Sequence, residues 1–315
     1  MILRSMLYTP ANSLRLVSNA ATLPMDAVIL DLEDAVPLAD KETARIFARD
    51  SMRLFKSGGA LIFVRLNSML SGLTEEDLKI VVAPGLNGVI LAKTEDELDV
   101  KSLHGMLEKA EKRAGLKAEE VKIVPLLESA RGILNSLQIA HASDRIVGLA
   151  FGAGDYYRDL GKDVAALSYD ENELLYARSH IVNVSKATGI QAIDTPYLGL
   201  LTDKERFMNE LRIASQLGFT GKQCIHPSQV VPVNRTFSPS DNEVVYASRL
   251  VEAFKEAEAK GIGAISFEGK MIDRMSYLQA KDLLSKKELI SVREDNQKRV
   301  SEVNVLEIFA KMKEA

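Results

Sequence analysis

The segment "KIVPLLESARG", residues 122–132, is apolar over five positions after Lys122 and then reaches a carboxylate, Glu128. A continuous apolar run of this kind is typical of a parallel strand that is buried on both faces. The residues that follow, 130–143, have the apolar spacing of a helix. The segment therefore predicts a strand-helix unit with a charged side chain at the end of the strand.

The same pattern occurs eight times along the 315 residues. The predicted strands lie within 3–10, 26–34, 60–67, 87–94, 122–129, 145–155, 190–197 and 221–227. The helical patterns that follow them lie within 12–23, 40–57, 74–85, 95–115, 130–143, 171–189, 203–218 and 241–261. Eight such units are the number that closes a parallel barrel with its helices outside. A doubly wound open sheet would read similarly, but the even spacing and the count favour the barrel.

We therefore predict an α/β fold, a (β/α)8 TIM barrel over residues 1–235, with a C-terminal helical extension over 236–315. The extension contains "SYLQAKDLLSKKELISVREDNQKRVSEVNVLEIFAKMKEA", residues 276–315, whose mixed charge and spacing indicate a helix.

Composition excludes several classes of protein. The 40 Lys and Arg residues against 44 Asp and Glu residues give a net charge of −4, and no segment concentrates basic residues beside aromatic ones, so we expect no nucleic-acid partner. The sequence contains no run of about 18 apolar residues that could span a membrane, and its first residues do not resemble a signal peptide. A single cysteine, Cys224, excludes an internal disulfide. We expect a cytoplasmic protein.

Polar side chains gather at the carboxyl ends of the predicted strands, which open on one face of a barrel. They are Asp31, Glu33, Asp34, Arg65, Asn67, Lys93, Glu128, Asp155, Asp194 and His226. Glu128 is therefore not alone at that face.

Glu128 and Asp155 follow consecutive strands, so their carboxylates could share a cation. Mg²⁺ prefers oxygen ligands and keeps several waters, which leaves positions for a substrate. Without a cation the two charges would repel and one pKa would rise. Each acid alone could instead cap the next helix or pair with Arg131 or Arg158; the two together favour metal.

Arg65 ends a strand of apolar residues, where its guanidinium suits a carboxylate or a developing oxyanion. An ion pair with Asp31, Glu33 or Asp34 explains it about equally well. The segment "FGAGDYYRDLG", residues 151–161, does not match the dinucleotide motif G-x-G-x-x-G, because Tyr157 replaces the last glycine. Its glycines, Gly154 among them, more plausibly let a ligand approach the backbone.

Two other strand ends allow competing chemistry. A desolvated Lys93 could form a Schiff base with a carbonyl substrate, although a lysine that reaches towards solvent is the commoner case. His226 could act as a general base or simply hold a structural hydrogen bond.

Seven segments form an ordered set of motifs: "RSMLYTPAN" (4–12), "VILDLEDAV" (28–36), "VRLN" (64–67), "PLLESARG" (125–132), "GAGDYYRDLG" (152–161), "GFTGKQCIHPSQ" (218–229) and "GAISFEGKMID" (263–273). In these motifs and their order, the chain resembles the citrate lyase β-subunit-like family of the HpcH/HpaI aldolase superfamily, which includes malyl-CoA and citramalyl-CoA lyases. The resemblance covers about residues 4–280.

The resemblance implies a Mg²⁺-dependent TIM barrel that makes or breaks a C–C bond beside a thioester. Glu128 and Asp155 would be the Mg²⁺ ligands, and Arg65 would bind the oxygen of a 2-oxo acid next to Gly154. Asp273 would be the catalytic acid or base, carried by the C-terminal extension as a lid segment into a neighbouring subunit's site. The assembly would be a homo-trimer or hexamer.

The function implied is an acyl-CoA lyase that releases acetyl-CoA and a 2-oxo acid from a 3-hydroxyacyl-CoA such as citramalyl-CoA or malyl-CoA. Two alternatives stay open. The first is a citrate lyase β subunit acting on a citryl thioester of an acyl carrier protein. The second is a non-catalytic barrel that only binds acyl-CoA.

Overall fold

The computed structural model describes residues 1–56 and 59–301. Eight parallel strands close into a barrel in the order of the sequence, and β1 pairs with β8 to complete it. The strands are β1 (Ser5–Pro10), β2 (Ala27–Asp31), β3 (Leu61–Leu66), β4 (Gly88–Leu91), β5 (Lys122–Leu127), β6 (Gly148–Phe151), β7 (Gln191–Asp194) and β8 (Gly221–Cys224). The predicted TIM barrel is confirmed.

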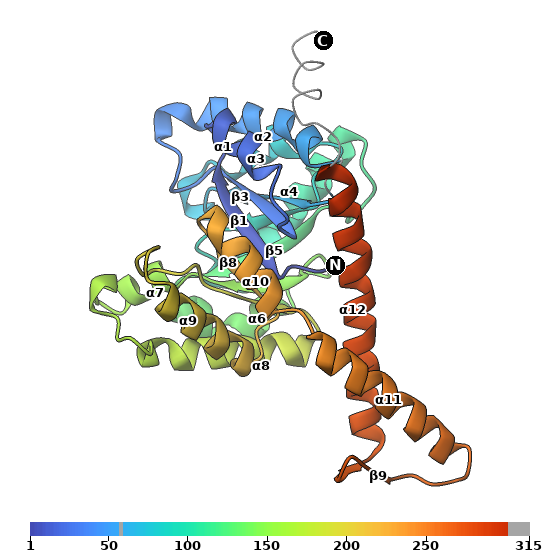
Figure 1. Ribbon diagram of the computed structural model, residues 1–315. Helices are drawn as coiled ribbons and strands as arrows, with labels where there is room; N and C mark the ends of the chain where they lie inside the picture. The colour runs from blue at the N-terminus through green and yellow to red at the C-terminus, as the bar shows by residue number, and fades with distance from the viewer. Residues whose placement is uncertain (57–58, 302–315) are drawn as a thin grey trace.

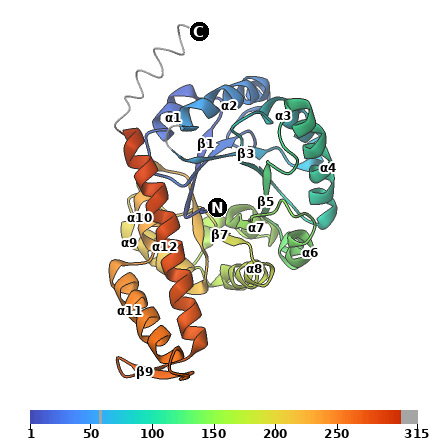
Figure 2. The ribbon, with the colours of Figure 1, turned by 90° about the vertical axis from the view of Figure 1, so that its right-hand side faces the viewer.

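The helices surround this barrel as a ring (Figure 2). They are α1 (Leu14–Ala20), α2 (Lys41–Lys56), α3 (Thr74–Val81), α4 (Glu97–Ala114), α5 (Ala130–Leu134), α6 (Ser136–Ala140), α7 (Ala153–Asp159), α8 (Leu175–Thr188), α9 (Lys204–Leu217) and α10 (Val230–Thr236). Short 3₁₀ turns occupy Leu38–Asp40, Met69–Ser71, Val164–Ala166, Asn172–Leu174 and Pro227–Gln229. Each helix after a strand returns the chain to the amino end of the next strand, so all strand ends of one kind lie on one face.

Burial on both faces of the strands explains their continuous apolar sequences. One apolar cluster fills the barrel interior, and a larger one lies between the strands and the helices. The interior cluster contains Leu3, Met6, Ala27, Ile29, Phe63, Ile90, Val124, Leu126, Ala150 and Ile193. The barrel is therefore a packed core, and space for a ligand exists only at its ends.

The C-terminal extension differs from the prediction in one respect. The predicted eighth helix corresponds to α11 (Asp241–Glu258), but α11 packs against α12 (Arg274–Ser301) instead of covering the barrel, and the short helix α10 packs against β1 and β8. The hairpin of β9 (Ile265–Phe267) and β10 (Lys270–Ile272) joins α11 to α12. An amphipathic pattern indicates that one face of a helix is buried, but it does not indicate which element covers that face.

This extension forms an arm with its own apolar cluster, which contains Ala247, Leu250, Val251, Phe254, Ile272, Tyr277 and Ala280. The arm projects from the barrel, with β9 at its far end (Figure 1). Near its other end, α12 contacts the barrel through ion pairs of Arg293 with Asp26 and of Glu294 with Arg4. Arg4 and Asp26 precede β1 and β2, so this contact is at the amino end of the barrel. The division of the chain at residue 235 stays a prediction, as does the helix expected beyond Ser301, which lies outside the described residues.

Within residues 1–56 and 59–301, no helix is both long enough and apolar enough to cross a membrane.

Candidate active site

Arg65 lies at the carboxyl end of β3, and Asp31 and Glu33 of the neighbouring β2 end hold it in place. Its Nε and one terminal nitrogen donate to the two carboxylate oxygens of Asp31 at 2.7 and 2.6 Å, and the other terminal nitrogen lies 3.1 Å from Glu33 Oε2. The guanidinium also lies over the ring of Tyr8, 4.8 Å from its centroid. The ion pair weighed from the sequence is therefore present.

These contacts do not use all of the hydrogen-bonding capacity of Arg65. Arginine has five N–H donors, and the contacts to Asp31 and Glu33 use three; Asp34 Oδ2 lies 3.9 Å from the terminal nitrogen that contacts Glu33, beyond hydrogen-bond distance. Arg65 is 9% exposed, so its side chain is largely removed from water while two donors are left for a ligand. A preorganised, desolvated guanidinium of this kind suits an anionic oxygen.

Glu128 follows β5 and is buried, with 7% of the residue exposed. Its Oε2 accepts a hydrogen bond from the backbone N–H of Lys93 at 2.9 Å. Burial raises the pKa of Glu128 to about 8; the positive charge of Arg65 opposes this, and the negative charges of Glu33 and Asp155 add to it. A buried carboxyl with acidic neighbours is therefore present at this strand end.

Asp155 lies in the first turn of α7, just beyond β6, and its carboxylate is 2.6 Å from a terminal nitrogen of Arg158. The pairing with Arg158 weighed from the sequence is correct. Arg131 instead pairs with Asp96 at 2.8 Å, and Ser129 caps α5, so neither alternative weighed for Glu128 is present. The Arg158 side chain is 76% exposed, so it offers Asp155 only a weak, solvent-screened partner.

The two acids offer the carboxylate oxygens that a magnesium ion prefers. The negative charge of Asp155 is one of the causes that raise the pKa of Glu128, and a divalent cation shared by the two would relieve that repulsion. Within the part of the chain that the structure describes, no group of three or more His, Cys, Asp or Glu side chains forms a metal cage. Mg²⁺ is commonly bound by one or two carboxylates, with waters and substrate as further ligands.

Gly154, predicted to lie against substrate, is in the first turn of α7. An added Cβ at this position would meet nothing within 4 Å. Packing within this chain therefore does not require a glycine here, and its role in substrate binding stays a prediction.

Lys93 does not have the environment of a Schiff-base lysine. Its Nζ is 2.5 Å from Glu33 Oε1 and 3.5 Å from Asp34 Oδ1. Burial alone would lower the pKa of Lys93, but Glu33 and Asp34 raise it above its usual value. A nucleophilic lysine needs the opposite shift. The Lys93 side chain is 37% exposed, so the lysine reaches towards solvent, as the sequence led us to expect, while its ammonium is paired with Glu33.

His226 has a structural role in this chain. Its Nδ1 accepts a hydrogen bond from the backbone N–H of Ser228 at 3.2 Å and caps a 3₁₀ turn, as the structural interpretation predicted. Asp194, also expected at the barrel mouth, instead faces the helices, where its carboxylate pairs with Arg178 and Lys222. Alternate residues of a strand point to opposite faces, which explains why a strand-end acid can miss the mouth.

Asp273 lies far from these residues along the arm. Its Oδ1 accepts hydrogen bonds from the backbone N–H and hydroxyl of Ser276 at 2.9 and 3.0 Å, so it caps the start of α12. Asp273 lies between β10 and α12, next to the hairpin whose strand β9 is at the projecting end of the arm (Figure 1), whereas α12 contacts the barrel at the barrel's amino end. The chain does not bring Asp273 to its own Arg65 and Glu128.

Sequence reasoning missed the pair formed by Tyr8 and Gln223 beside Arg65. The Tyr8 hydroxyl donates to Gln223 Oε1 at 2.8 Å, and Gln223 Nε2 donates to the carbonyls of Phe151 and Asp194 at 2.8 and 3.1 Å. The available signal was the sequence of β8, Gly-Lys-Gln-Cys, which places polar side chains in a strand that is buried on both faces. The pair links the ends of β1, β6, β7 and β8 under the guanidinium.

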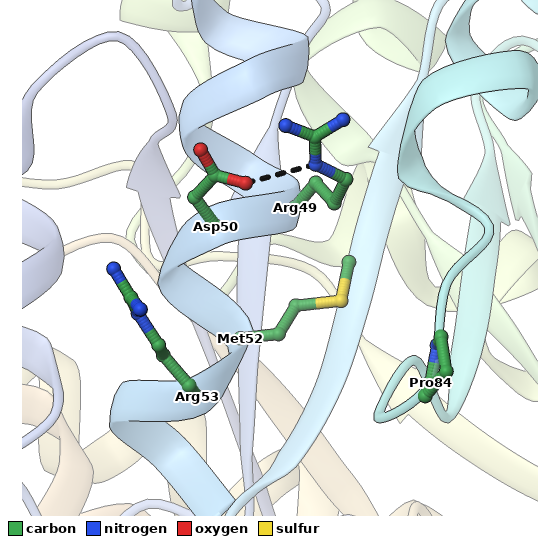
Figure 3. Close-up of a pocket in the computed structure, with 5 residues that line it drawn as sticks. All are labelled: Arg49, Asp50, Met52, Arg53 and Pro84. Carbon is green, nitrogen blue, oxygen red and sulfur yellow. Dashed lines mark hydrogen bonds and ion pairs between the residues drawn. The ribbon is translucent and has the colours of Figure 1, made fainter. Parts of the chain in front are cut away.

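A hollow of about 350 Å³ lies elsewhere on the molecule, lined by Arg49, Asp50, Met52, Arg53 and Pro84 (Figure 3). It is formed by the second half of α2 and the loop before β4, hence towards the amino ends of the strands. Arg49 is paired with Asp50 at 2.8 Å. None of the strand-end residues described above lines it.

The fold is a TIM barrel with a cluster of charged side chains at the carboxyl ends of its strands. A family model described as HpcH/HpaI aldolase/citrate lyase matches residues 4–227. The chain belongs to this family, as the sequence motifs predicted, and its homologues are named lyases.

The relatives carry two names. Citrate lyase subunit beta of Leuconostoc mesenteroides subsp. cremoris is 35% identical over 281 residues, which cover 89% of this chain and 92% of the relative. The mitochondrial citramalyl-CoA lyase of Rattus norvegicus is 33% identical over 299 residues, which cover 90% of this chain and 85% of the relative. Both proteins therefore match along most of their length.

A solved structure is also similar. The protein CitE of Mycobacterium tuberculosis, in complex with magnesium, acetoacetate and coenzyme A, superposes with a TM-score of 0.70 at 29% identity. The match covers 90% of this chain and 97% of that one. It extends over the barrel and much of the arm.

Proposed function

We propose that this protein is a Mg²⁺-dependent acyl-CoA lyase that cleaves, or forms, the C–C bond of a 3-hydroxyacyl-CoA such as citramalyl-CoA or malyl-CoA. The products of cleavage are acetyl-CoA and a 2-oxo acid. The observation that carries the proposal is the strand-end cluster, in which the buried Arg65 keeps two N–H donors for a ligand close to the buried carboxyl of Glu128. Relatives named citramalyl-CoA lyase, 32–33% identical to this chain, support it.

Glu128 and Asp155 would hold the metal. Bound Mg²⁺ would polarise the oxygens of the 2-oxo acid and neutralise part of the charge that develops on them. The raised pKa of Glu128 supports this assignment, because a cation would stabilise its charged form. The magnesium in structures of M. tuberculosis CitE supports it as well.

Arg65 would bind the oxygens of the 2-oxo acid with its two remaining N–H donors. Asp31 and Glu33 orient the guanidinium before any ligand arrives, so little reorganisation is needed during the reaction. In cleavage, water takes the proton of the 3-hydroxyl, the carbonyl of the 2-oxo acid forms as the C–C bond breaks, and the electron pair of that bond forms the enolate of acetyl-CoA. Arg65 then stabilises the oxygens of the new carbonyl compound.

Asp273 would transfer the proton at the enolate carbon. In the conformation described here, the hydrogen bonds from Ser276 lower the pKa of Asp273. The ionised form suits removal of a proton from acetyl-CoA in the bond-forming direction; in cleavage the protonated acid returns that proton. Because Asp273 lies on a projecting arm, we infer that it serves the barrel of a neighbouring subunit in a homo-trimer or hexamer. The compartment expected for this assembly is the cytoplasm, which the single, buried thiol of Cys224 supports.

A panel of hydroxyacyl-CoA thioesters tests the activity. Purified protein with Mg²⁺ should release a 2-oxo acid from at least one of citramalyl-CoA and malyl-CoA, as measured by coupled reduction of the oxo acid. Absence of turnover with every thioester, while CoA still binds, would favour the non-catalytic barrel instead.

The second candidate is a citrate lyase β subunit. Relatives named citrate lyase subunit beta are 35–37% identical to this chain, slightly more than the citramalyl-CoA lyases. This candidate requires a citryl thioester on an acyl carrier protein. Comparing citryl thioesters of CoA and of a carrier protein with citramalyl-CoA distinguishes the two, because only the first candidate turns over a CoA thioester efficiently without a carrier.

Complementation tests the shared site. Asp273→Asn should abolish proton transfer, and Arg65→Ala should inactivate the barrel; each variant alone is expected to be inactive. Mixing the two under conditions of subunit exchange should restore part of the activity, because some sites then combine an intact barrel with an intact arm. If the subunits exchange and no activity returns, Asp273 does not act in a neighbour.

A further inference from the structure

Glu128 is held from both neighbouring strands, because β5 lies between β4 and β6. On the β4 side, the backbone N–H of Lys93 donates to Glu128 Oε2 at 2.9 Å. On the β6 side lies Gly152, where an added Cβ would be 2.5 Å from Glu128 Cγ and 2.7 Å from Oε1. A side chain at residue 152 would therefore displace the carboxylate from its present position.

Lys93 has an unusual backbone conformation. Its φ angle is +52°, in the left-handed region that residues with a Cβ rarely adopt. The next residue fixes this turn twice, since Thr94 N–H donates to the Leu126 carbonyl at 3.1 Å and Thr94 Oγ1 donates to the Leu91 carbonyl at 2.9 Å. Such conformations persist where the surroundings determine them, and they are concentrated at functional sites.

The side chain of Lys93 contacts a second acid. Its Nζ lies 2.5 Å from Glu33 Oε1, and Glu33 Oε2 lies 3.1 Å from a terminal nitrogen of Arg65. The sequence of contacts from Glu128 through Lys93 and Glu33 to Arg65 is thus continuous. It joins the carboxylate assigned to the metal with the guanidinium assigned to the 2-oxo acid.

We propose that Lys93 is a positioning residue that serves both halves of the site. Its backbone N–H fixes the Glu128 carboxylate against Gly152. Its ammonium fixes Glu33, and Glu33 in turn fixes the terminal nitrogen of Arg65 that does not contact Asp31. The inference rests on the proposed function. A lysine with only a surface ion pair would not affect ligand binding, and this difference makes the two roles separable.

Binding measurements without turnover test it. Isothermal titration of the full chain with Mg²⁺, and then with pyruvate at saturating Mg²⁺, gives two dissociation constants for each variant. Lys93→Met removes the ammonium but keeps the backbone N–H. We expect its Kd for pyruvate to rise about tenfold while its Kd for Mg²⁺ changes less than about threefold. Lys93→Arg, which keeps the charge, should restore pyruvate binding to within about threefold.

Gly152→Ala tests the other side of Glu128. Its Cβ should displace the carboxylate and raise the Kd for Mg²⁺ at least about tenfold. The matched control is Gly105→Ala on α4, where an added Cβ meets nothing within 4 Å, and both constants should stay unchanged. Thermal unfolding of all variants identifies any that lose their fold, and the Lys93 variants test the proposal even if Gly152→Ala does not fold.

Three results would overturn the proposal: wild-type pyruvate binding in Lys93→Met, failure of Lys93→Arg to restore it, or unchanged Mg²⁺ binding in a folded Gly152→Ala. If the binding pattern holds but no thioester is cleaved by the wild type, the lyase activity is rejected and the positioning role of Lys93 remains.

Discussion

Arg4 and Arg65 are both buried arginines paired with an aspartate, but they lie at opposite ends of the barrel. Arg4, 0% exposed, precedes β1 and uses four of its five N–H donors on Asp26, Ser238 and Glu294. Arg65, 9% exposed, ends β3 and uses three, all on acids of the same face. A buried arginine paired with an aspartate therefore has most of its donors occupied at the amino end of the barrel, whereas at the carboxyl end it keeps two donors for a ligand.

The comparison teaches how to separate a structural from a functional charge. Burial and an acidic partner do not distinguish the two arginines. The number of donors left for a ligand does, together with the strand end at which the residue lies. One substitution made at both positions should therefore give two different defects.

The largest effect is expected for Arg65→Lys. A lysine keeps the charge but loses the fork that contacts Asp31 and presents two donors to the oxo acid. We expect kcat/KM for the preferred thioester to fall about 1000-fold, or about 4 kcal/mol of transition-state stabilisation. The free energy of unfolding should change by less than about 1 kcal/mol in urea titrations, and a variant with full activity would show that Arg65 is structural.

Arg4→Lys should give the opposite result. One ammonium cannot contact Asp26, Ser238 and Glu294 at the same time, and Asp26 is fully buried. We expect the free energy of unfolding to fall by about 2 kcal/mol. The kcat/KM of the folded protein should stay within about twofold of the wild type, and a selective loss of activity would contradict the assignment of the amino end to stability.

A third buried arginine, Arg178, extends the comparison to the pH dependence of stability. With Lys222 it offers two cations to three carboxylates, Glu171, Asp194 and Glu210. Burial raises the pKa of Glu210 to about 7; Lys222 and Arg178 oppose the shift, and Glu171 and Asp194 add to it. Between about pH 4.5 and 7, Glu210 is therefore protonated in the folded state and ionised in the unfolded state.

The resulting stability is present below about pH 4.5 and is lost as the pH rises through 7, by up to about 1.4 kcal/mol per pH unit. Glu210→Gln cannot ionise, so it should lose less stability than the wild type between pH 5 and 8. Urea titrations across this range measure the difference. Parallel profiles for the two proteins would show that Glu210 keeps its charge in the fold.

The smallest effect is expected for Arg293→Ala. Arg293 joins α12 to the barrel through Asp26 at 2.9 Å and the Gly59 carbonyl at 3.0 Å, but Asp26 keeps Arg4 as a partner when Arg293 is removed. We expect about 1 kcal/mol of lost stability. A loss larger than that of Arg4→Lys would reverse the proposed order of the two arginines.

The sequence allowed the barrel and its strand ends to be predicted, because burial of strands on both faces leaves continuous apolar runs that polar residues terminate. The partners of these residues could not be predicted, since they depend on the loops and on side-chain conformation. Arg131 pairs with Asp96 and not with Glu128, for example. Asp194 was misplaced because a shift of one residue along a strand changes the face it occupies.

The packing of the arm also could not be predicted from the sequence. The spacing of residues 241–258 correctly predicted a helix, but an amphipathic face does not specify its partner, and the partner is α12 and not the barrel. The close approach of Gly152 to Glu128 was also invisible, because it depends on the positions of two strand ends in space.

The central claim is that the carboxyl end of the barrel, with Glu128 and Asp155 as metal ligands, is the site of a Mg²⁺-dependent lyase. The most direct measurement is release of the 2-oxo acid from the preferred thioester, first in EDTA and then after Mg²⁺ is restored, for the wild type, Glu128→Gln and Asp155→Asn. The account predicts that EDTA abolishes wild-type activity, that Mg²⁺ restores it, and that the two folded variants stay below about 1% at every Mg²⁺ concentration. Full wild-type activity in EDTA, or full activity of both variants, would contradict it.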